Sequence, residues 1–285
     1  MNVPIRIDLS SKVAVVTGGG GVLCGCMAKA LAACGAKVAI LDLRKDAADA
    51  VAAEITADGG VAAGFECNVL EPASIQKACA DITAKFGPAD ILVNGAGGNH
   101  PKGTTSKDFL EKADLGQVAE GVKTFFDLDP AGIQFVFNLN CLGTLLPTQV
   151  FSRAMAERGH GTIVNISSMN AFTPLTRIPA YSAAKAAVSN MTQWLATHFS
   201  KVGIRVNAIA PGFFLTNQNR GLLTNPDGTY TARAQKILAN TPMNQFGTPE
   251  DLLGALLWLV SDEAARFVTG VVVPVDGGFN AYSGV

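Results

Sequence analysis

Short runs of β-branched and other apolar residues alternate with alanine-rich stretches along almost the whole of this 285-residue chain. We expect strands at 12–16, 37–41, 61–66, 90–93, 162–166, 205–209 and 271–275. We expect helices between them at 22–34, 46–58, 72–86, 130–157, 179–202 and 249–260. Several of the strands are apolar at nearly every position, which is typical of a parallel sheet covered on both faces. The alternation therefore predicts an α/β fold with a doubly wound sheet.

Two long segments interrupt this alternation, and each follows the carboxyl end of an expected strand. The first, at about 98–129, is polar and rich in glycine, lysine and threonine, and the second lies at about 212–247. Long irregular segments at this edge of a doubly wound sheet commonly bind ligands or cover them. Because α/β folds of this length often form one domain, we interpret 1–285 as a single domain with a lid-like insert and a substrate loop.

The composition excludes several classes of function. Only 16% of the residues are charged and the net charge is −1, so there is no basic field for nucleic acid or an anionic membrane. The apolar stretches are far shorter than the roughly 20 residues that span a bilayer, and the N-terminus lacks an apolar signal core. The six cysteines form no CxxC pair and the three histidines are far apart, so we expect reduced thiols and no metal site. These features predict a soluble cytoplasmic protein.

The most informative side chains are Tyr181 and Lys185, which stand one helical turn apart. A free phenol has a pKa of about 10, too high for ready proton exchange near neutral pH. A neighbouring ammonium group favours the phenolate and lowers that pKa. An alcohol or carbonyl oxygen held between Tyr181 and Ser168 could then exchange a proton while hydride moves at carbon. Such a short motif also occurs on exposed helix faces, so this prediction of an oxidoreductase depends on the rest of the chain.

A run of four glycines, 18–21, joins the first expected strand to the first helix, where a backbone can approach a pyrophosphate closely. Asp42 ends the second strand and can accept hydrogen bonds from both adenosine ribose hydroxyls, which favours NAD over NADP. Arg44 argues the other way, because a guanidinium can bind the 2′-phosphate of NADP. The residues expected to bind the cofactor at these strand ends are Thr17, Gly18, Gly20, Gly21, Val22, Leu23, Asp42, Arg44, Asn68, Val69, Asn94, Gly95, Ala96 and Gly97.

Taken together, these motifs resemble the short-chain dehydrogenase/reductase family from about residue 12 to the C-terminus. They are TGGGG at 17–21, Asp42, NGAG at 94–97, Asn140, Ser168, Tyr181 with Lys185, Pro211-Gly212 and DGG at 276–278. The resemblance implies a single Rossmann-like domain with a seven-stranded parallel sheet and helices on both faces, assembled as a homotetramer. The chain departs from the family at Val22, Cys24 and Asn68, where Gly, Gly and Asp are common.

The resemblance also assigns roles. It implies that Tyr181 is the general acid/base, that Lys185 lowers its pKa and holds the nicotinamide ribose, and that Ser168 hydrogen-bonds the substrate oxygen. Asn140 would anchor a water molecule that relays protons, although Asn138 stands nearby. The loop expected over the nicotinamide contributes Pro211, Gly212, Phe214 and Thr216, and Tyr181 and Lys185 also face the cofactor.

The substrate pocket is expected to be polar. The first long segment is roughly 20 residues longer than the family leads us to expect, and it contains Asn99 and His100. Asn170 and Arg177 flank the catalytic motifs, and Gln218 and Arg220 belong to the second long segment. Amides suit hydroxyls and cations suit a carboxylate, so we predict a sugar-acid substrate bound by Ser168, Tyr181 and these residues.

Four segments, at 97–105, 125–132, 142–151 and 166–190, are similar to the D-mannonate oxidoreductase (fructuronate reductase) branch of the family. That similarity implies interconversion of D-mannonate and D-fructuronate with NAD(H). Two alternatives stay open: another polyol or sugar-acid dehydrogenase, such as one acting on gluconate, and a non-catalytic dinucleotide-sensing protein. A sensing protein would be expected to lose part of the Ser168, Tyr181 and Lys185 set, which this chain keeps.

Two expected helices, 130–157 and 179–202, are apolar on several sides. Their large apolar residues are Phe151, Met155, Met191, Trp194, Leu195 and Phe199. One sheet cannot cover all sides of a helix, so we expect these residues to make subunit contacts.

Overall fold

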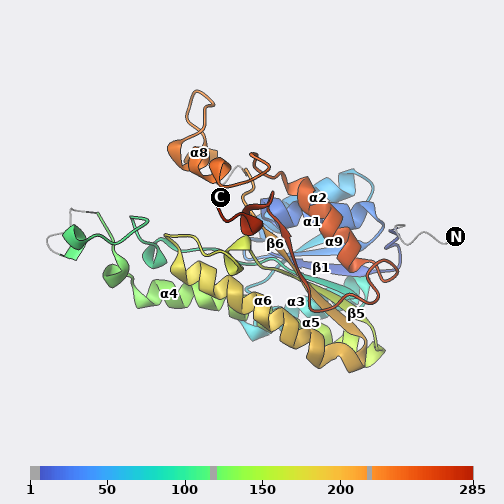
Figure 1. The fold of residues 1–285 in the computed structure, drawn as a ribbon. Helices are drawn as coiled ribbons and strands as arrows, with labels where there is room; N and C mark the ends of the chain where they lie inside the picture. Colours follow the sequence, from blue (N-terminus) through green and yellow to red (C-terminus); the bar gives the residue numbers. More distant parts are fainter. Residues whose placement is uncertain (1–6, 116–120, 217–219, 285) are drawn as a thin grey trace.

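The computed structural model describes residues 7–115, 121–216 and 220–284. Within them, seven strands form one parallel sheet in the order β3-β2-β1-β4-β5-β6-β7. Figure 1 shows this sheet with helices packed around it. The strands are β1 (Val13–Thr17), β2 (Lys37–Asp42), β3 (Val61–Glu66), β4 (Ile91–Asn94), β5 (Gly161–Ile166), β6 (Ile204–Pro211) and β7 (Val272–Val275). Every expected strand is present within two residues of its predicted ends, and the predicted doubly wound α/β fold is confirmed.

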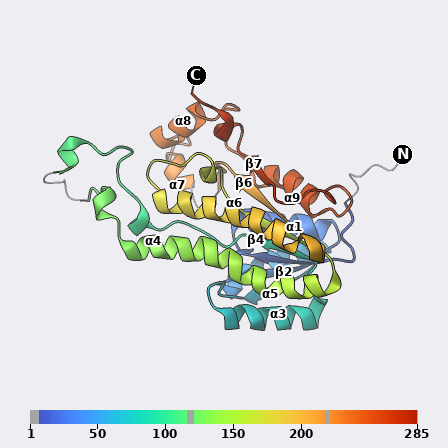
Figure 2. The same cartoon turned by 60° about the horizontal axis from the view of Figure 1, so that its bottom comes forward.

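Helices cover both faces of the sheet (Figure 2). Alternate residues of β1 enter two separate cores, Ala14 and Val16 one and Val13 and Val15 the other, because successive strand side chains point to opposite faces. The first core is closed by α1 (Val22–Ala33), α2 (Lys45–Ala57) and α9 (Leu253–Val260). The second is closed by α3 (Pro72–Phe86), α5 (Gly143–Arg158) and α6 (Pro179–Phe199).

The expected helix 130–157 is divided by a wide turn. It begins as α4 (Pro130–Phe137), passes through a π-helical turn at Asn138–Leu142 and continues as α5. Extra-wide turns of this kind are frequent at functional sites, because they redirect a side chain within an otherwise regular helix. Here the turn carries Asn140.

Both long segments lie at the carboxyl edge of the sheet. In its described residues, the insert holds three short 3-10 helices, at Pro101–Gly103, Lys112–Leu115 and Phe125–Asp127, and it reaches away from the body beyond α4 (Figure 1). The second segment contains α7 (Arg220–Leu223) and α8 (Ala232–Ala239), which were not predicted. Thr231 caps α8 by accepting a hydrogen bond from the Ala234 amide at 3.3 Å, and this start signal is visible in the sequence.

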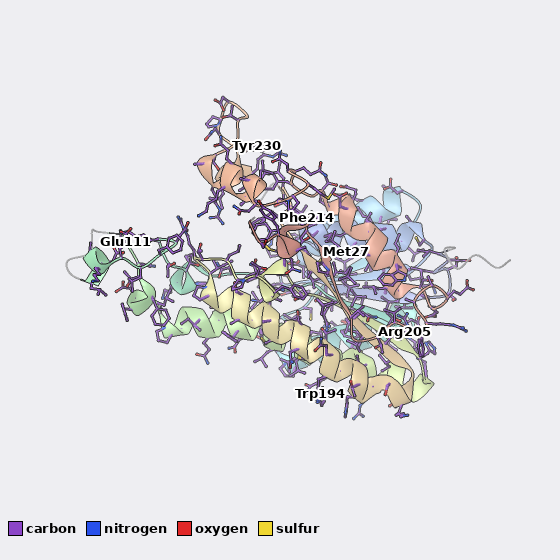
Figure 3. The ribbon with its side chains drawn as sticks, viewed as in Figure 1. Met27, Glu111, Trp194, Arg205, Phe214 and Tyr230 are labelled. Carbon is purple, nitrogen blue, oxygen red and sulfur yellow. The ribbon has the colours of Figure 1, made fainter. Side chains whose placement is uncertain are left out.

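The expectation that the apolar residues of α5 and α6 make subunit contacts is wrong for three of the six residues named for it. Phe151, Met155 and Leu195 are buried in the second core, because these helices press onto the sheet with α3 beside them. Met191 and Phe199 are partly buried against the same core. Trp194, which Figure 3 labels, is 58% exposed. Its ring stacks on that of His198. The tetramer stays a prediction.

No helix in the described ranges has the length and apolar character that crossing a membrane requires. All six cysteines are free thiols. Within the same ranges, no group of three or more His, Cys, Asp or Glu side chains is close enough to hold a metal ion.

Candidate active site

Ser168, Tyr181 and Lys185 meet where β5 ends and α6 begins. Ser168 follows β5 and caps a short 3-10 turn, Met169–Ala171, while Tyr181 and Lys185 lie in the first turns of α6. The Ser168 hydroxyl is hydrogen-bonded to the Tyr181 phenol. One oxygen placed against this pair would contact two hydroxyl groups at once, which suits an alcohol or a ketone.

Lys185 is fixed from two sides. Its side chain is buried, and its ammonium group donates a hydrogen bond to the Ile166 carbonyl oxygen at 2.7 Å. The same nitrogen lies 5.7 Å from the centre of the Tyr181 ring. Burial lowers the pKa of Lys185 to about 8, because a charged ammonium is less stable away from water.

The pKa of Tyr181 moves in the direction opposite to the prediction. Burial raises it, and the hydrogen bond from Ser168 opposes that rise only in part. The ammonium of Lys185 was expected to dominate, but both groups are buried and desolvation disfavours a charge on each. Tyr181 is therefore a phenol that holds its proton well above neutral pH, ready to act as an acid.

Asn140 holds the loop after β4 against the helix. Its side-chain amide donates to the carbonyl oxygens of Gly98 and Val136, each at 2.8 Å, and its oxygen accepts from the Gly98 amide at 3.3 Å. A Cβ atom on Gly97 would lie 2.7 Å from that oxygen and 3.2 Å from the Lys185 nitrogen. Gly97 is thus wedged between Asn140 and Lys185, and the four predicted catalytic residues converge on one place.

The glycine-rich turn has a shape that side chains would fill. Gly18 has φ +64, and a Cβ on it would approach the Ala96 backbone to 3.0 Å. Gly21 caps α1 without a side-chain hydrogen bond, so the first amides of this helix are open to an anion. Val22 and Leu23 form the start of the same helix.

Asp42 is anchored beside this turn. One carboxylate oxygen accepts from the Gly20 amide at 3.1 Å and the other from the Arg44 amide at 3.1 Å, while the Arg44 side chain is exposed. The glycine turn, the open helix end and a fixed carboxylate together fit the pyrophosphate and adenosine ribose of a dinucleotide. A nicotinamide dinucleotide would supply the hydride donor or acceptor.

Cys24, which stands where a glycine was expected, fills the space beside Gly95. Its sulfur lies so near Gly95 that a Cβ there would come within 2.1 Å of it. Thr17 ties the same loop down, since its hydroxyl accepts from the Gly95 and Ala96 amides at 3.0 and 3.2 Å. Burial raises the pKa of the Cys24 thiol to about 12, so it stays neutral and acts as packing.

The side chains of several predicted cofactor residues form hydrogen bonds with, or pack against, other residues of the protein. The Asn94 amide donates to Thr148 and Asn165, each at 2.9 Å, and the Asn68 amide bonds Glu71 and the Leu70 backbone. Val69 and Phe214 are buried in the two cores.

The loop after β6 is pressed against the DGG motif. A Cβ on Gly212 would lie 2.6 Å from the Asp276 backbone. Pro211 ends β6, and Thr216 accepts a hydrogen bond from the Arg220 amide at 2.9 Å. The predicted nicotinamide loop is therefore held at the carboxyl edge of the sheet.

The predicted substrate residues are spread around this edge. Asn170 lies next to Ser168 and is buried, and its side-chain oxygen has no partner among the described residues. Asn99 bonds Thr104 at 3.1 Å and His100 accepts from the Lys102 amide at 3.1 Å, so both contact their own loop. Arg220 is exposed at the start of α7, and Gln218 lies outside the described residues.

A cavity of about 480 Å³ has one wall in the segment Thr173–Ile178, which ends three residues before Tyr181. Its walls come from the segment between Ser168 and Tyr181, from α8, and from the insert through Asp108. Among the described residues, Arg177 is the one predicted substrate residue that lines it. Several polar and aromatic lining residues were not predicted, namely Asp108, Phe213, Arg233, Lys236, Asn240 and Phe279. The charges of α8 could have been found had its Thr231 cap been recognised.

Comparison with known proteins agrees with this geometry. A family model described as Enoyl-(Acyl carrier protein) reductase matches residues 23–280. An uncharacterized oxidoreductase of Haemophilus influenzae is 58% identical over all of this chain and 99% of its own length.

Two solved structures share the fold. A candidate D-mannonate oxidoreductase from Haemophilus influenza with bound NAD has a TM-score of 0.93 and 57% identity, and the match covers 100% of both chains. A gluconate 5-dehydrogenase from Burkholderia cenocepacia, in complex with NADP and tartrate, has a TM-score of 0.83 and 28% identity over 99% of this chain and 100% of its own. The chain belongs to the short-chain dehydrogenase/reductase family of oxidoreductases.

Proposed function

We propose that the protein is an NAD(H)-dependent oxidoreductase that interconverts a hydroxyl and a ketone of a sugar acid, with D-mannonate and D-fructuronate as the pair. The observation that carries this proposal is the convergence of Ser168, Tyr181 and Lys185. A cavity with cationic side chains in its lining supports it, because one wall of that cavity ends three residues before Tyr181. A nicotinamide cofactor would supply or accept the hydride. The dinucleotide would be held by the glycine turn, Asp42 and Lys185.

The protein's own residues handle the proton. In ketone reduction, Tyr181 gives its phenolic proton to the ketone oxygen as negative charge builds there. Ser168 donates a hydrogen bond to the same oxygen and stabilises that charge. Lys185 stabilises the phenolate that remains, because its ammonium group lies over the phenol ring. Asn140 keeps the loop at Gly97 and Gly98 in place beside Lys185.

The cofactor preference rests on Asp42. A carboxylate anchored by two backbone amides pairs well with ribose hydroxyls and repels a 2′-phosphate. The NAD bound in the Haemophilus structure supports the same choice. The NADP in the more distant gluconate 5-dehydrogenase belongs to a chain only 28% identical.

The substrate pair rests on similarity and on the pocket. The 57% identical structure is named for D-mannonate, and the unpaired oxygen of Asn170 beside Ser168 suits a substrate hydroxyl. Gluconate is the second candidate, because a gluconate 5-dehydrogenase shares the fold. We also propose a homotetramer in the cytoplasm, with the insert acting as a lid, and light scattering tests the assembly.

A panel of ketones tests the proposal. Purified protein with NADH and either D-fructuronate or 5-ketogluconate should consume NADH fastest with D-fructuronate. Turnover of 5-ketogluconate alone would replace the substrate pair, and turnover of neither acid would refute the sugar-acid function. NADPH consumption faster than NADH consumption would refute the cofactor preference.

A further inference from the structure

The cavity between the segment Thr173–Ile178 and α8 carries a local positive charge. Among the residues that the structure describes, three cationic side chains line it, Arg177, Arg233 and Lys236, and one carboxylate, that of Asp108. The whole chain has a net charge of −1, so this excess is a property of the cavity and not of the protein at large. A cavity with such a lining favours an anionic ligand.

Asp108 connects the insert to the two other walls of the cavity, which are the segment Thr173–Ile178 and α8. Its carboxylate accepts from the Arg177 Nε at 2.6 Å and from the Thr176 hydroxyl at 3.2 Å, and it also accepts from the Lys236 ammonium on α8. Lys236 and Arg177 hold the pKa of Asp108 well below its usual range, so the carboxylate is charged at any physiological pH. Asp108 thus fixes two of the three cations.

After Asp108 has paired with Arg177 and Lys236, some guanidinium nitrogens of the cavity lining still lack an acceptor among the described residues. Asp108 engages Arg177 through Nε, and within the described ranges the two terminal nitrogens of that guanidinium have no protein acceptor. The side chain of Arg233 has neither an ion pair nor a hydrogen bond to any described residue, although it lines the cavity. A guanidinium that is not already paired can bind a carboxylate through two parallel hydrogen bonds.

One wall of the cavity is continuous in sequence with the helix that carries Tyr181. Its wall at Thr173–Ile178 is the segment between the Ser168 turn and the start of α6, three residues before Tyr181. A sugar acid has its carboxylate several carbons from the oxygen that reacts. We infer that a molecule of that kind, bound with its reacting oxygen at Tyr181, extends into the cavity, where Phe213 and Phe279 provide apolar surface for its C–H groups.

We propose that Arg233, together with the terminal nitrogens of Arg177, binds the carboxylate of the substrate, and that Asp108 and Lys236 position Arg177 for this contact. The proposal rests on the sugar-acid function proposed above and assigns the residues that select an acid over a neutral sugar. Asp108 is a positioning residue. It does not contact the ligand itself and acts by holding the cations in place.

The test compares two ligand pairs that differ only at the carboxylate. D-fructuronate and D-fructose are matched ketones, and D-mannonate and D-mannitol are matched alcohols in which CH₂OH replaces the carboxylate. In Arg233→Gln, the KM for D-fructuronate should rise roughly 10- to 100-fold with kcat nearly unchanged, because charge-assisted hydrogen bonds are lost from ground state and transition state alike. The Kd of D-mannitol should stay the same. Arg233→Lys should recover part of the loss.

Arg266→Gln is the matched control, since it removes one exposed positive charge from a residue outside the cavity lining. It should leave the KM for D-fructuronate unchanged. An unchanged KM in Arg233→Gln, or an equal loss of affinity for D-mannonate and D-mannitol, would overturn the proposal.

The binding measurements separate this proposal from the proposed function. If the wild-type protein turns over no sugar acid, the function fails, but calorimetry with D-mannonate still compares wild type and Arg233→Gln. Normal turnover of D-fructuronate by wild type and by Arg233→Gln at equal KM would leave the function intact and remove Arg233 from it.

Discussion

The two ends of this active site are built in different ways. At the cofactor end, close backbone approaches set the shape: Gly18 against Ala96, Gly97 against Asn140, and Gly95 against Cys24. At the substrate end, side chains from distant parts of the chain make the pocket, with Asp108 paired to Arg177 and Lys236. The first kind of site leaves little room for variation. The second can change its ligand by exchanging a few exposed side chains while the chemistry stays the same.

Loss of the Tyr181 hydroxyl should have the largest effect on turnover, because the cofactor and the substrate are both expected to bind beside that hydroxyl. Tyr181→Phe should lower kcat for D-fructuronate reduction by roughly 10²- to 10⁴-fold, the usual contribution of a positioned acid. NADH binding, followed by fluorescence titration, should change little. Wild-type turnover in this variant would mean that Tyr181 is not the acid and that another group protonates the substrate oxygen.

A methyl group on Gly95 tests whether close packing controls the cofactor end. Gly95→Ala puts a Cβ 2.1 Å from the Cys24 sulfur and 2.8 Å from the Thr17 carbonyl oxygen, and should lower the free energy of unfolding by about 1–3 kcal/mol. Urea unfolding measures the loss. Adding Cys24→Ala should restore part of it by removing the sulfur.

Gly98→Ala is the matched control for this loop. A Cβ at Gly98 meets only a Leu139 methyl group, at 3.7 Å, which is an ordinary contact. Its stability should stay close to that of the wild type. Equal losses at Gly95 and Gly98 would show that the loop tolerates no side chain anywhere and that Cys24 has no special part.

The pH dependence of the rate tests Lys185, which lies where the two ends meet. With its pKa at about 8, Lys185 is charged below that pH and neutral above it. Only the charged form stabilises the phenolate, so kcat for ketone reduction should fall as pH rises through about 8. Lys185→Met should be slower throughout and should lack this step. The same step in Lys185→Met would assign it to another group.

Asp108→Asn should have only a small effect on stability. Its partners Arg177 and Lys236 are largely exposed, and ion pairs in water contribute little to the free energy of unfolding. Hydrogen exchange of the insert should nevertheless become faster, because its tie to α8 is weakened. Unchanged exchange at 101–115 would show that other contacts hold the insert.

The cofactor end was largely predictable and the substrate end was not. Local pattern was enough to predict the strands, the glycine turn and the strand-tip carboxylate of Asp42, since each depends on neighbours in sequence. Asp108 and Lys236 are far apart in the chain, and no local signal pairs them. The pKa of Tyr181 was predicted in the wrong direction for a related reason: burial depends on the whole fold, whereas the spacing to Lys185 is visible in sequence.

The most direct test is a crystal structure of Tyr181→Phe with NAD and D-mannonate bound. We expect the hydroxyl that is oxidised to lie within hydrogen-bonding distance of Ser168, next to the nicotinamide, with the carboxylate of the sugar acid on Arg233. A sugar acid bound with its carboxylate toward solvent and its hydroxyls away from Ser168 would contradict this account of the site.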